Sequence, residues 1–261
     1  MTNLRPITLI TGASAGIGAE LARIFAQRGH ELMLVARREQ QLASLADEIA
    51  GFGKSRPLVL ALDLIRPDAS GRIAEALMAN TAEPEFVVNN AGFGLVGPAA
   101  ELDRARQLEM VDLNVRTLTD LSLAFLDSLI RRRGGLMNVA SLAGFMPGPG
   151  MAVYYASKAY VLSFTEALHR ELAPQGVRVT ALCPGPVPTE FQARAGISDD
   201  QFPAFLARSA DRVAKEGYNG LMRGRRVVIP GTTNKVTALL PRFLPRAVML
   251  AATDARQKRR R

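Results

Sequence analysis

The chain has 261 residues, of which 48% are hydrophobic and 22% are charged, and it carries a net charge of +9. This composition is ordinary for a globular protein with a sizeable core, and it excludes a disordered chain. One cysteine and two histidines exclude an intrachain disulfide and predict no metal site, and no apolar run approaches the ~18 residues that span a bilayer. The first residues lack the features of a secretory signal, so we expect a cytoplasmic protein.

Short apolar runs typical of strands alternate with helical patterns along the chain. Strands are expected at residues 7–11, 31–36, 58–63, 86–89, 136–140, 177–183 and 226–230. Helices are expected at residues 19–28, 39–50, 69–79 and 103–132, with a further helix that carries Tyr154 and ends near residue 172. We therefore expect one α/β domain over residues 1–261. Its fold would be a Rossmann-like doubly wound parallel sheet of about seven strands in the order 3-2-1-4-5-6-7, with helices on both faces.

A glycine-rich turn, residues 11–18, joins the first strand to the first helix. Backbone amides at a helix N-terminus bind phosphate, and glycines let a pyrophosphate approach the chain closely. The same residues also match G-x-S-x-G, the nucleophile turn of serine hydrolases, with Ser14 as the nucleophile. Only one strand precedes Ser14, and His169 falls within a helix, so the hydrolase is the weaker alternative. The candidate phosphate-binding residues are Gly12, Ser14, Gly16, Ile17 and Gly18.

The residues at the end of the second strand indicate which nicotinamide cofactor the protein would bind. An acidic residue at this point would hold the ribose hydroxyls of NAD, whereas arginine suits the additional phosphate of NADP. The chain has Arg37 and Arg38 here, and its first acid is Glu39. Two guanidiniums bind phosphate through charge-assisted hydrogen bonds, so NADP(H) is favoured over NAD(H). The alternative is that both arginines are only surface charges.

A tyrosine and a lysine lie four residues apart at Tyr154 and Lys158, downstream of Ser141. On a helix this spacing places both side chains on one face. An ammonium beside a phenol favours the phenolate, so the phenol exchanges protons nearer neutral pH. Such a pair also occurs by chance on helices. Tyr155 is a competing tyrosine, but only Tyr154 has the four-residue spacing to Lys158.

Taken in order along the chain, these motifs resemble the short-chain dehydrogenase/reductase family from residue 11 to about residue 189. The family's N-N-A-G appears as residues 89–92, its asparagine as Asn114, its serine as Ser141, and its Y-x-x-x-K as Tyr154 and Lys158. The resemblance implies that these last four residues are catalytic. Tyr154 would donate a proton to a carbonyl, Ser141 would orient that carbonyl, and Lys158 would depress the phenol pKa and hold the nicotinamide ribose. Asn114 would position a water that links Lys158 to solvent.

The resemblance also implies further contacts to the cofactor. Asp63 and Leu64 match the position that contacts adenine, and residues 184–189 match the P-G-x-x-x-T segment that holds the nicotinamide amide. As structural alternatives, Ser141 would simply end a strand, and Asn114 would satisfy buried backbone groups. The implied cofactor-binding residues are Asp63, Leu64, Asn90, Ala91, Gly92, Tyr154, Lys158, Pro184, Gly185, Val187 and Thr189.

The substrate is predicted from the polarity of two segments. Residues 143–151 and an insertion at 189–225, which contains Phe191, Phe202 and Phe205, suggest an apolar pocket under a lid. We expect an NADP-dependent oxidoreductase that interconverts an apolar carbonyl and alcohol, in a homodimer or homotetramer as the resemblance implies. The alternative is a non-catalytic NADP-binding sensor or scaffold with the same fold.

The end of the chain holds the whole excess of positive charge. Residues 221–261 contain 11 Lys and Arg against one acid, whereas residues 1–220 contain 22 against 23. Phe243 is the only aromatic residue after Tyr218, so we expect no nucleic-acid partner. Residues 236–261 mix apolar and cationic side chains, which predicts that they cover the active site or touch an anionic membrane surface. The alternative is a solvated tail without a specific partner.

Overall fold

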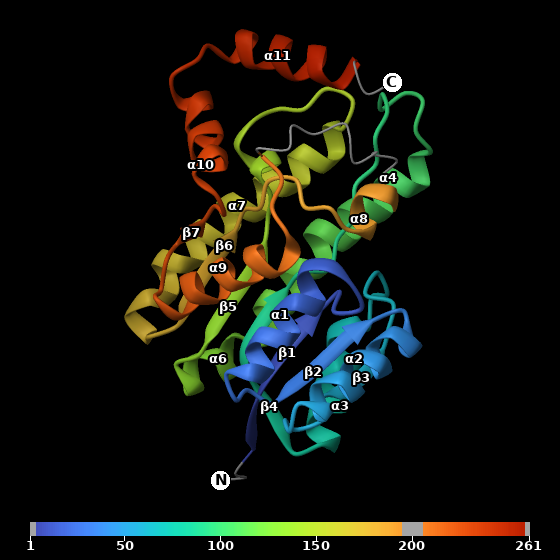
Figure 1. Cartoon of the computed structure of the whole chain (residues 1–261), viewed down its shortest axis with the longest axis vertical. Coiled ribbons are helices and arrows are strands. Elements are labelled where there is room, and N and C mark those ends of the chain that lie inside the picture. Colours follow the sequence, from blue (N-terminus) through green and yellow to red (C-terminus); the bar gives the residue numbers. More distant parts are fainter. Residues whose placement is uncertain (1–3, 195–205, 259–261) are drawn as a thin grey trace.

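The computed structural model describes residues 4–194 and 206–258 (Figure 1). Its seven strands form one parallel sheet in the order β3-β2-β1-β4-β5-β6-β7, which confirms the predicted topology. The strands are β1 (Arg5–Thr11), β2 (Leu32–Ala36), β3 (Leu58–Ala61), β4 (Ala82–Asn89), β5 (Gly135–Val139), β6 (Arg178–Leu182) and β7 (Val227–Val228). The strand order reverses between β1 and β4, and in doubly wound sheets ligands bind in the crevice at this point.

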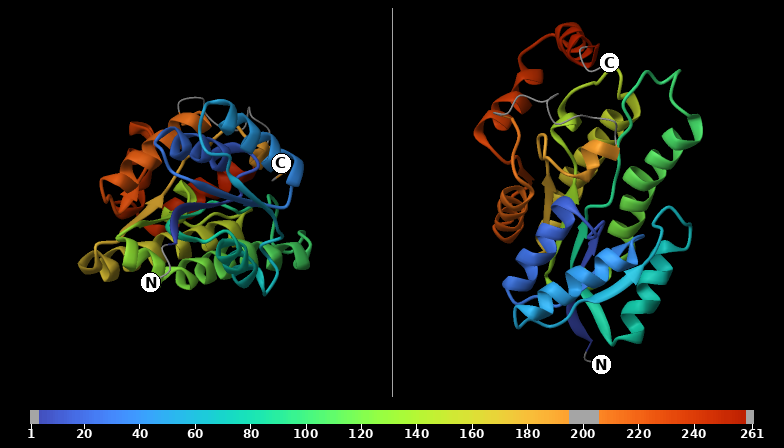
Figure 2. Two further views of the ribbon diagram at one scale, coloured as in Figure 1. Left: turned by 90° about the horizontal axis from the view of Figure 1, so that it is seen from below. Right: turned by 45° about the vertical axis from the view of Figure 1, so that its right-hand side comes forward.

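Helices cover both faces of the sheet (Figure 2). They are α1 (Gly16–Gln27), α2 (Glu39–Gly51), α3 (Ala69–Ala79), α4 (Arg104–Val111), α5 (Leu118–Ala124), α6 (Leu126–Arg132), α7 (Ala152–Leu172), α8 (Glu190–Arg194), α9 (Ala210–Met222), α10 (Thr232–Leu239) and α11 (Arg246–Lys258). Buried side chains of α1, α2 and α9 form one hydrophobic core, and those of α3, α5, α6 and α7 form the other. The strands between the two cores are buried on both faces, which explains runs such as β2 that are wholly apolar.

The predicted helix over residues 103–132 is interrupted. After α4 the chain forms a π-helical stretch, Asp112–Thr117, and it breaks again at Phe125 between α5 and α6. The prediction of one continuous helix over these residues is therefore wrong. The buried residues of the π-helical stretch, Asn114 and Thr117, are both polar, so apolar periodicity could not locate this interruption. A π-helical turn adds a residue to the helix and often occurs at a functional site, and here it contains Asn114.

The predicted lid at residues 189–225 divides into two parts that pack in different places. Helix α9 packs against α1, with Val213, Ala214 and Leu221 buried in the core, so this part supports the sheet. Phe202 and Phe205 lie outside the described residues. Among the described residues, the part beside the cavity is the short helix α8 and Leu206. A lid role for that part stays a prediction.

The last helices, α10 and α11, lie at the end of the molecule opposite the N-terminus (Figure 1). The strands run toward that same end, because the sheet is parallel and β1 starts beside the N-terminus. Within the described ranges, no helix is both long enough and apolar enough to cross a membrane.

Candidate active site

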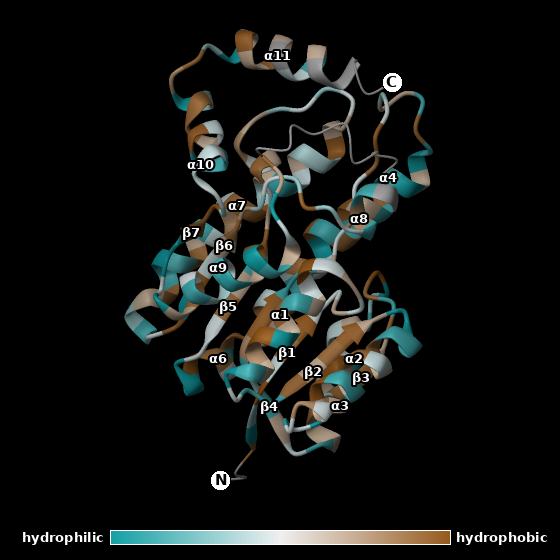
Figure 3. Ribbon diagram, in the orientation of Figure 1, coloured by the Kyte–Doolittle hydropathy of each residue, from teal (hydrophilic) through white to brown (hydrophobic). Residues whose placement is uncertain are grey.

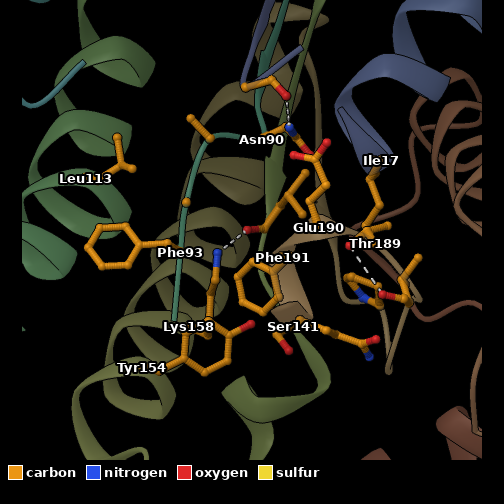
Figure 4. A pocket seen from close by; sticks show the side chains of 18 of the residues that line it. Ile17, Asn90, Phe93, Leu113, Ser141, Tyr154, Lys158, Thr189, Glu190 and Phe191 are labelled. Carbon is orange, nitrogen blue, oxygen red and sulfur yellow. Dashed lines mark hydrogen bonds between the residues drawn. The ribbon is translucent and has the colours of Figure 1, made fainter. Parts of the chain in front are cut away.

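A cavity of about 670 Å³ lies at the carboxyl ends of the strands (Figure 4). The loops after β1, β2, β3, β4, β5 and β6 all contribute to its lining. Each of these loops carries one of the predicted motifs. The motifs meet at one cavity because parallel strands end at the same edge of the sheet. Of the site residues predicted from sequence, all except Gly18 and Asn114 line the cavity.

The glycine-rich turn has the geometry of a phosphate site. Gly12 and Gly16 adopt φ angles of 64° and 56°, which side chains rarely tolerate, and both residues line the cavity. A Cβ on Gly18 would lie 2.4 Å from the backbone oxygen of Gly12, so this glycine permits the close packing of helix and turn. Helix α1 has no acid in its first turn and no side chain capping its N-terminus. Its first amides are therefore available to a pyrophosphate, and the turn fits a dinucleotide cofactor.

Asn90 connects this turn to the end of β4. Its Nδ2 donates to the carbonyls of Thr11 and Gly12 at 3.0 and 3.1 Å, and its backbone N–H donates to Oγ1 of Thr11 at 3.0 Å. The N–H of Ala91 donates to the same oxygen at 3.2 Å. These bonds fix the loops after β1 and β4 relative to each other, so Asn90 helps to define the lining of the cavity.

The two arginines after β2 line the cavity, but Arg38 has a partner that the sequence did not reveal. Its Nη1 forms a 2.8 Å ion pair with Glu190 at the start of α8, and its Nη2 donates to Oγ of Ser14 at 3.0 Å. The ion pair joins residues 152 positions apart across the cavity, which sequence spacing alone does not predict. A phosphate bound at Arg38 would replace or share this carboxylate.

Ser141, Tyr154 and Lys158 gather at the other end of the cavity (Figure 4). Oγ of Ser141 accepts a hydrogen bond from the N–H of Ala143 at 3.1 Å, which leaves the Ser141 proton for the phenol of Tyr154. Lys158 lies one helical turn after Tyr154 on α7, and its Nζ is 5.9 Å from the centre of the Tyr154 ring. The predicted trio is therefore assembled on one side of a common space.

Burial shifts the pKa values of Tyr154 and Lys158. Burial raises the pKa of Tyr154 to about 12, against a smaller lowering by the hydrogen bond from Ser141. Burial also lowers the pKa of Lys158 to about 8, and its Nζ donates to the carbonyl of Val139 at 2.8 Å. Desolvation is therefore the main influence on both groups, and a lowering of the phenol pKa by Lys158 stays a prediction.

Asn114 is fully buried in the π-helical stretch and does not line the cavity. Its Oδ1 accepts from the N–H of Phe93 at 3.1 Å, and its Nδ2 donates to the carbonyl of Phe93 at 2.9 Å and to Oγ of Ser157 at 3.2 Å. Both ends of the amide therefore bind the loop after β4. This is the structural alternative considered for Asn114, although its Oδ1 also lies close to Gly92 and so to the amine of Lys158.

Apolar side chains that the motifs did not single out surround the trio. Phe93 and Met151 line the cavity, and the ring of Phe191 lies 5.7 Å from that of Tyr154 (Figure 4). Among the phenylalanines of the predicted lid, only Phe191 falls within the described residues. Gln192 also lines the cavity; it is 4% exposed, and its Oε1 has no hydrogen-bond partner among the described residues.

Comparison with known proteins agrees with this arrangement of motifs. Residues 6–199 match the family described as short chain dehydrogenase. The chain belongs to the short-chain dehydrogenase family. This short-chain dehydrogenase is 39% identical over 188 residues to sulfoacetaldehyde reductase 2 of Chromohalobacter salexigens, covering 71% of the chain and 74% of the relative.

Solved structures share the fold. A short-chain dehydrogenase from Sphingobium yanoikuyae in complex with NADPH has a TM-score of 0.80 and 32% identity, covering 93% of this chain and 97% of the other. A short chain dehydrogenase/reductase from Burkholderia phymatum in complex with NAD has a TM-score of 0.79 and 23% identity, covering 92% and 94%. Our short-chain dehydrogenase is thus an NAD(P)-dependent oxidoreductase acting on CH–OH and C=O groups.

Proposed function

We propose that this protein uses NADP(H) to reduce the carbonyl of an apolar substrate, with Tyr154 as the proton donor. The observation that carries the proposal is a single cavity with Ser141, Tyr154 and Lys158 at one end and Arg37 and Arg38 at the other. This arrangement supplies a proton donor where a carbonyl would react and two cations where a ribose phosphate would bind.

Bound NADPH would supply the hydride, and the residues of the chain would supply the proton and the orientation. With a pKa of about 12, the phenol of Tyr154 stays protonated at neutral pH, so it is ready to donate in the direction of reduction. The Ser141 hydroxyl is oriented by the N–H of Ala143, and a bound substrate oxygen would replace the phenol of Tyr154 as the acceptor of its proton. Lys158 is held by the Val139 carbonyl beneath this group, where it would bond a ribose hydroxyl.

The preference for NADP(H) is supported by charge at the end of β2. Arg37 is exposed at the cavity edge, and Arg38 already binds a carboxylate there. Charge-assisted hydrogen bonds contribute about 1.5–3 kcal/mol each, so one bond to the additional phosphate favours NADPH by at least about tenfold.

The substrate proposal is supported by the walls around the trio. The cations among the described lining residues are Arg37, Arg38, Arg106 and Lys158. Arg106 pairs with Glu109 at 2.5 Å and lies over the ring of Phe93, so it is already neutralised. The charge of an anionic substrate such as sulfoacetaldehyde, the substrate named for the relative, would find little compensation beside these walls. A neutral apolar carbonyl needs no such compensation. Gln192 could hydrogen-bond one polar group of such a substrate.

We also propose that two copies pair through their long helices. Leu108 and Val111 on α4, Leu123 on α5 and Tyr160 on α7 are apolar side chains exposed on this surface. Contact between copies would remove them from water. Light scattering during size-exclusion chromatography measures this directly, and a monomer at micromolar concentration would contradict it.

The test is steady-state kinetics against a panel of neutral apolar ketones and aldehydes, with sulfoacetaldehyde as the anionic comparison. We expect kcat/KM to be higher with NADPH than with NADH by at least about tenfold, and Arg37→Ala with Arg38→Ala to abolish that preference. A preference for NADH contradicts the cofactor proposal, and a preference for sulfoacetaldehyde contradicts the substrate proposal. Tight NADPH binding without turnover of any carbonyl would favour the non-catalytic sensor.

A further inference from the structure

The segment 232–250 carries an exposed apolar surface, which we call the apical patch. More than half of the exposed large hydrophobic side chains among the described residues lie in it. Phe243 is 80% exposed and Val236 is 57% exposed, values typical of side chains that pack against nothing. The apolar members of the patch are Val236, Leu239, Leu240, Phe243, Leu244, Val248 and Leu250. Exposed apolar side chains gathered in one segment in this way indicate an interaction site.

Exposed cations are interspersed with these apolar side chains. Lys235, Arg242 and Arg246 are exposed within the patch, and Asp254 is the only acid in the sequence after residue 220. Figure 3 shows the two kinds of residue alternating along α10 and α11 at one end of the molecule. The partner that fits both properties is anionic at its surface and apolar beneath it.

Pairing of the patch with the same patch of a second copy is unfavourable. It would bring together two surfaces that both carry Arg242 and Arg246, with Asp254 as the only acid in the sequence after residue 220. Closure over the cavity does not account for the patch either. Among the side chains of α10 and α11 that the structure describes, only Thr237 lines the cavity, while Val236 and Leu239 on the same helix remain exposed.

We propose that the apical patch docks on an anionic lipid surface, with its apolar side chains in the interface and its cations on the lipid phosphates. Amphipathic segments bind membranes in this way, and each cation near the surface strengthens binding by about fivefold. Thr237 places the cavity directly beside the docked surface. If the proposed function is correct, a carbonyl dissolved in the membrane would reach the cavity from that side. Docking itself requires neither cofactor nor turnover.

Co-sedimentation with vesicles tests the proposal on the full chain. Phosphatidylcholine vesicles are compared with vesicles that also contain phosphatidylglycerol, and we expect strong binding only to the anionic vesicles. Val236→Ser with Phe243→Ser should weaken that binding by at least about tenfold, because two exposed apolar side chains no longer enter the interface. The matched control is Phe52→Ser with Met78→Ser, two equally exposed apolar residues elsewhere on the surface, and it should bind as the wild type does.

The charges have their own variant and control. Arg242→Gln with Arg246→Gln should reduce binding by roughly 25-fold, whereas Arg104→Gln with Lys215→Gln, exposed cations outside the patch, should leave it unchanged. Circular dichroism confirms that each variant is folded. The proposal is overturned if the chain binds neither kind of vesicle, or if the patch variants and the control variants bind the anionic vesicles equally well. It is also overturned if the patch variants change the oligomeric state in solution and leave vesicle binding intact.

Discussion

Replacing Lys158 by Met should make the free protein more stable while it abolishes activity. The amine is buried and has its pKa lowered from 10.5 to about 8, which means that its charged form is disfavoured in the fold. The penalty is fully present below pH 8, where the folded protein must hold the charge. It is relieved as pH rises through the folded pKa of about 8, and it is gone above the unfolded pKa of 10.5.

The displacement of this pKa from 10.5 to about 8 corresponds to about 3 kcal/mol of unfavourable free energy at neutral pH. The methionine side chain fills the same space without a charge. It also leaves the Val139 carbonyl without its 2.8 Å hydrogen bond, at a cost of about 1–3 kcal/mol. The net expectation at pH 7 is a variant more stable than the wild type by up to about 2 kcal/mol.

Urea unfolding followed by circular dichroism, at several values of pH, measures this difference. The advantage of Lys158→Met should shrink by about 2 kcal/mol between pH 7 and about 9.5. Burial raises the pKa of the Cys183 thiol, which lowers stability at alkaline pH in both proteins, and Lys158 opposes this rise only as a smaller influence, so the difference between the two proteins reports mainly on the lysine. A variant less stable than the wild type at pH 7, or a difference independent of pH, would refute the reasoning.

Two further substitutions test the cofactor end of the cavity. Gly18→Ala places a Cβ 2.4 Å from Nδ2 of Asn90 and should destabilise the fold by about 1–3 kcal/mol in the same unfolding assay. The control is Gly71→Ala on α3, where the Cβ meets nothing within 4 Å and no destabilisation is expected. Equal effects of the two substitutions would contradict the packing argument. Glu190→Gln removes the carboxylate that holds Arg38, so fluorescence titration should show NADPH binding tightened by up to about fivefold and NADH unaffected. If the affinities for NADPH and NADH increase equally, the additional phosphate of NADPH does not bind at Arg38.

Much of this site could be predicted from sequence because its motifs are local. The glycine-rich turn lies between a strand and a helix, and Tyr154 and Lys158 lie one turn apart on α7, so short-range geometry determines their arrangement. The order of the sheet also followed from the alternation of strands and helices, which admits few topologies.

Other features depend on packing that local sequence does not encode. The ion pair between Arg38 and Glu190 joins distant segments, and the π-helical stretch around Asn114 buries polar side chains, so an apolar pattern does not locate it. The pKa of Tyr154 depends on how deeply its phenol is buried, which the four-residue spacing to Lys158 does not reveal. For the same reason α9 was assigned to a lid, although its apolar face packs against α1.

The most direct test of the central claim is Tyr154→Phe, measured for carbonyl reduction at saturating NADPH and for NADPH binding. Removing the phenol oxygen should lower kcat by at least about 100-fold, because a positioned proton donor contributes 10²–10⁴-fold, while the affinity for NADPH is kept. Tyr155→Phe, which alters the neighbouring tyrosine, should retain most of the wild-type rate. If Tyr154→Phe reduces the carbonyl within about tenfold of the wild-type rate, the phenol is not the proton donor and the proposed mechanism is wrong.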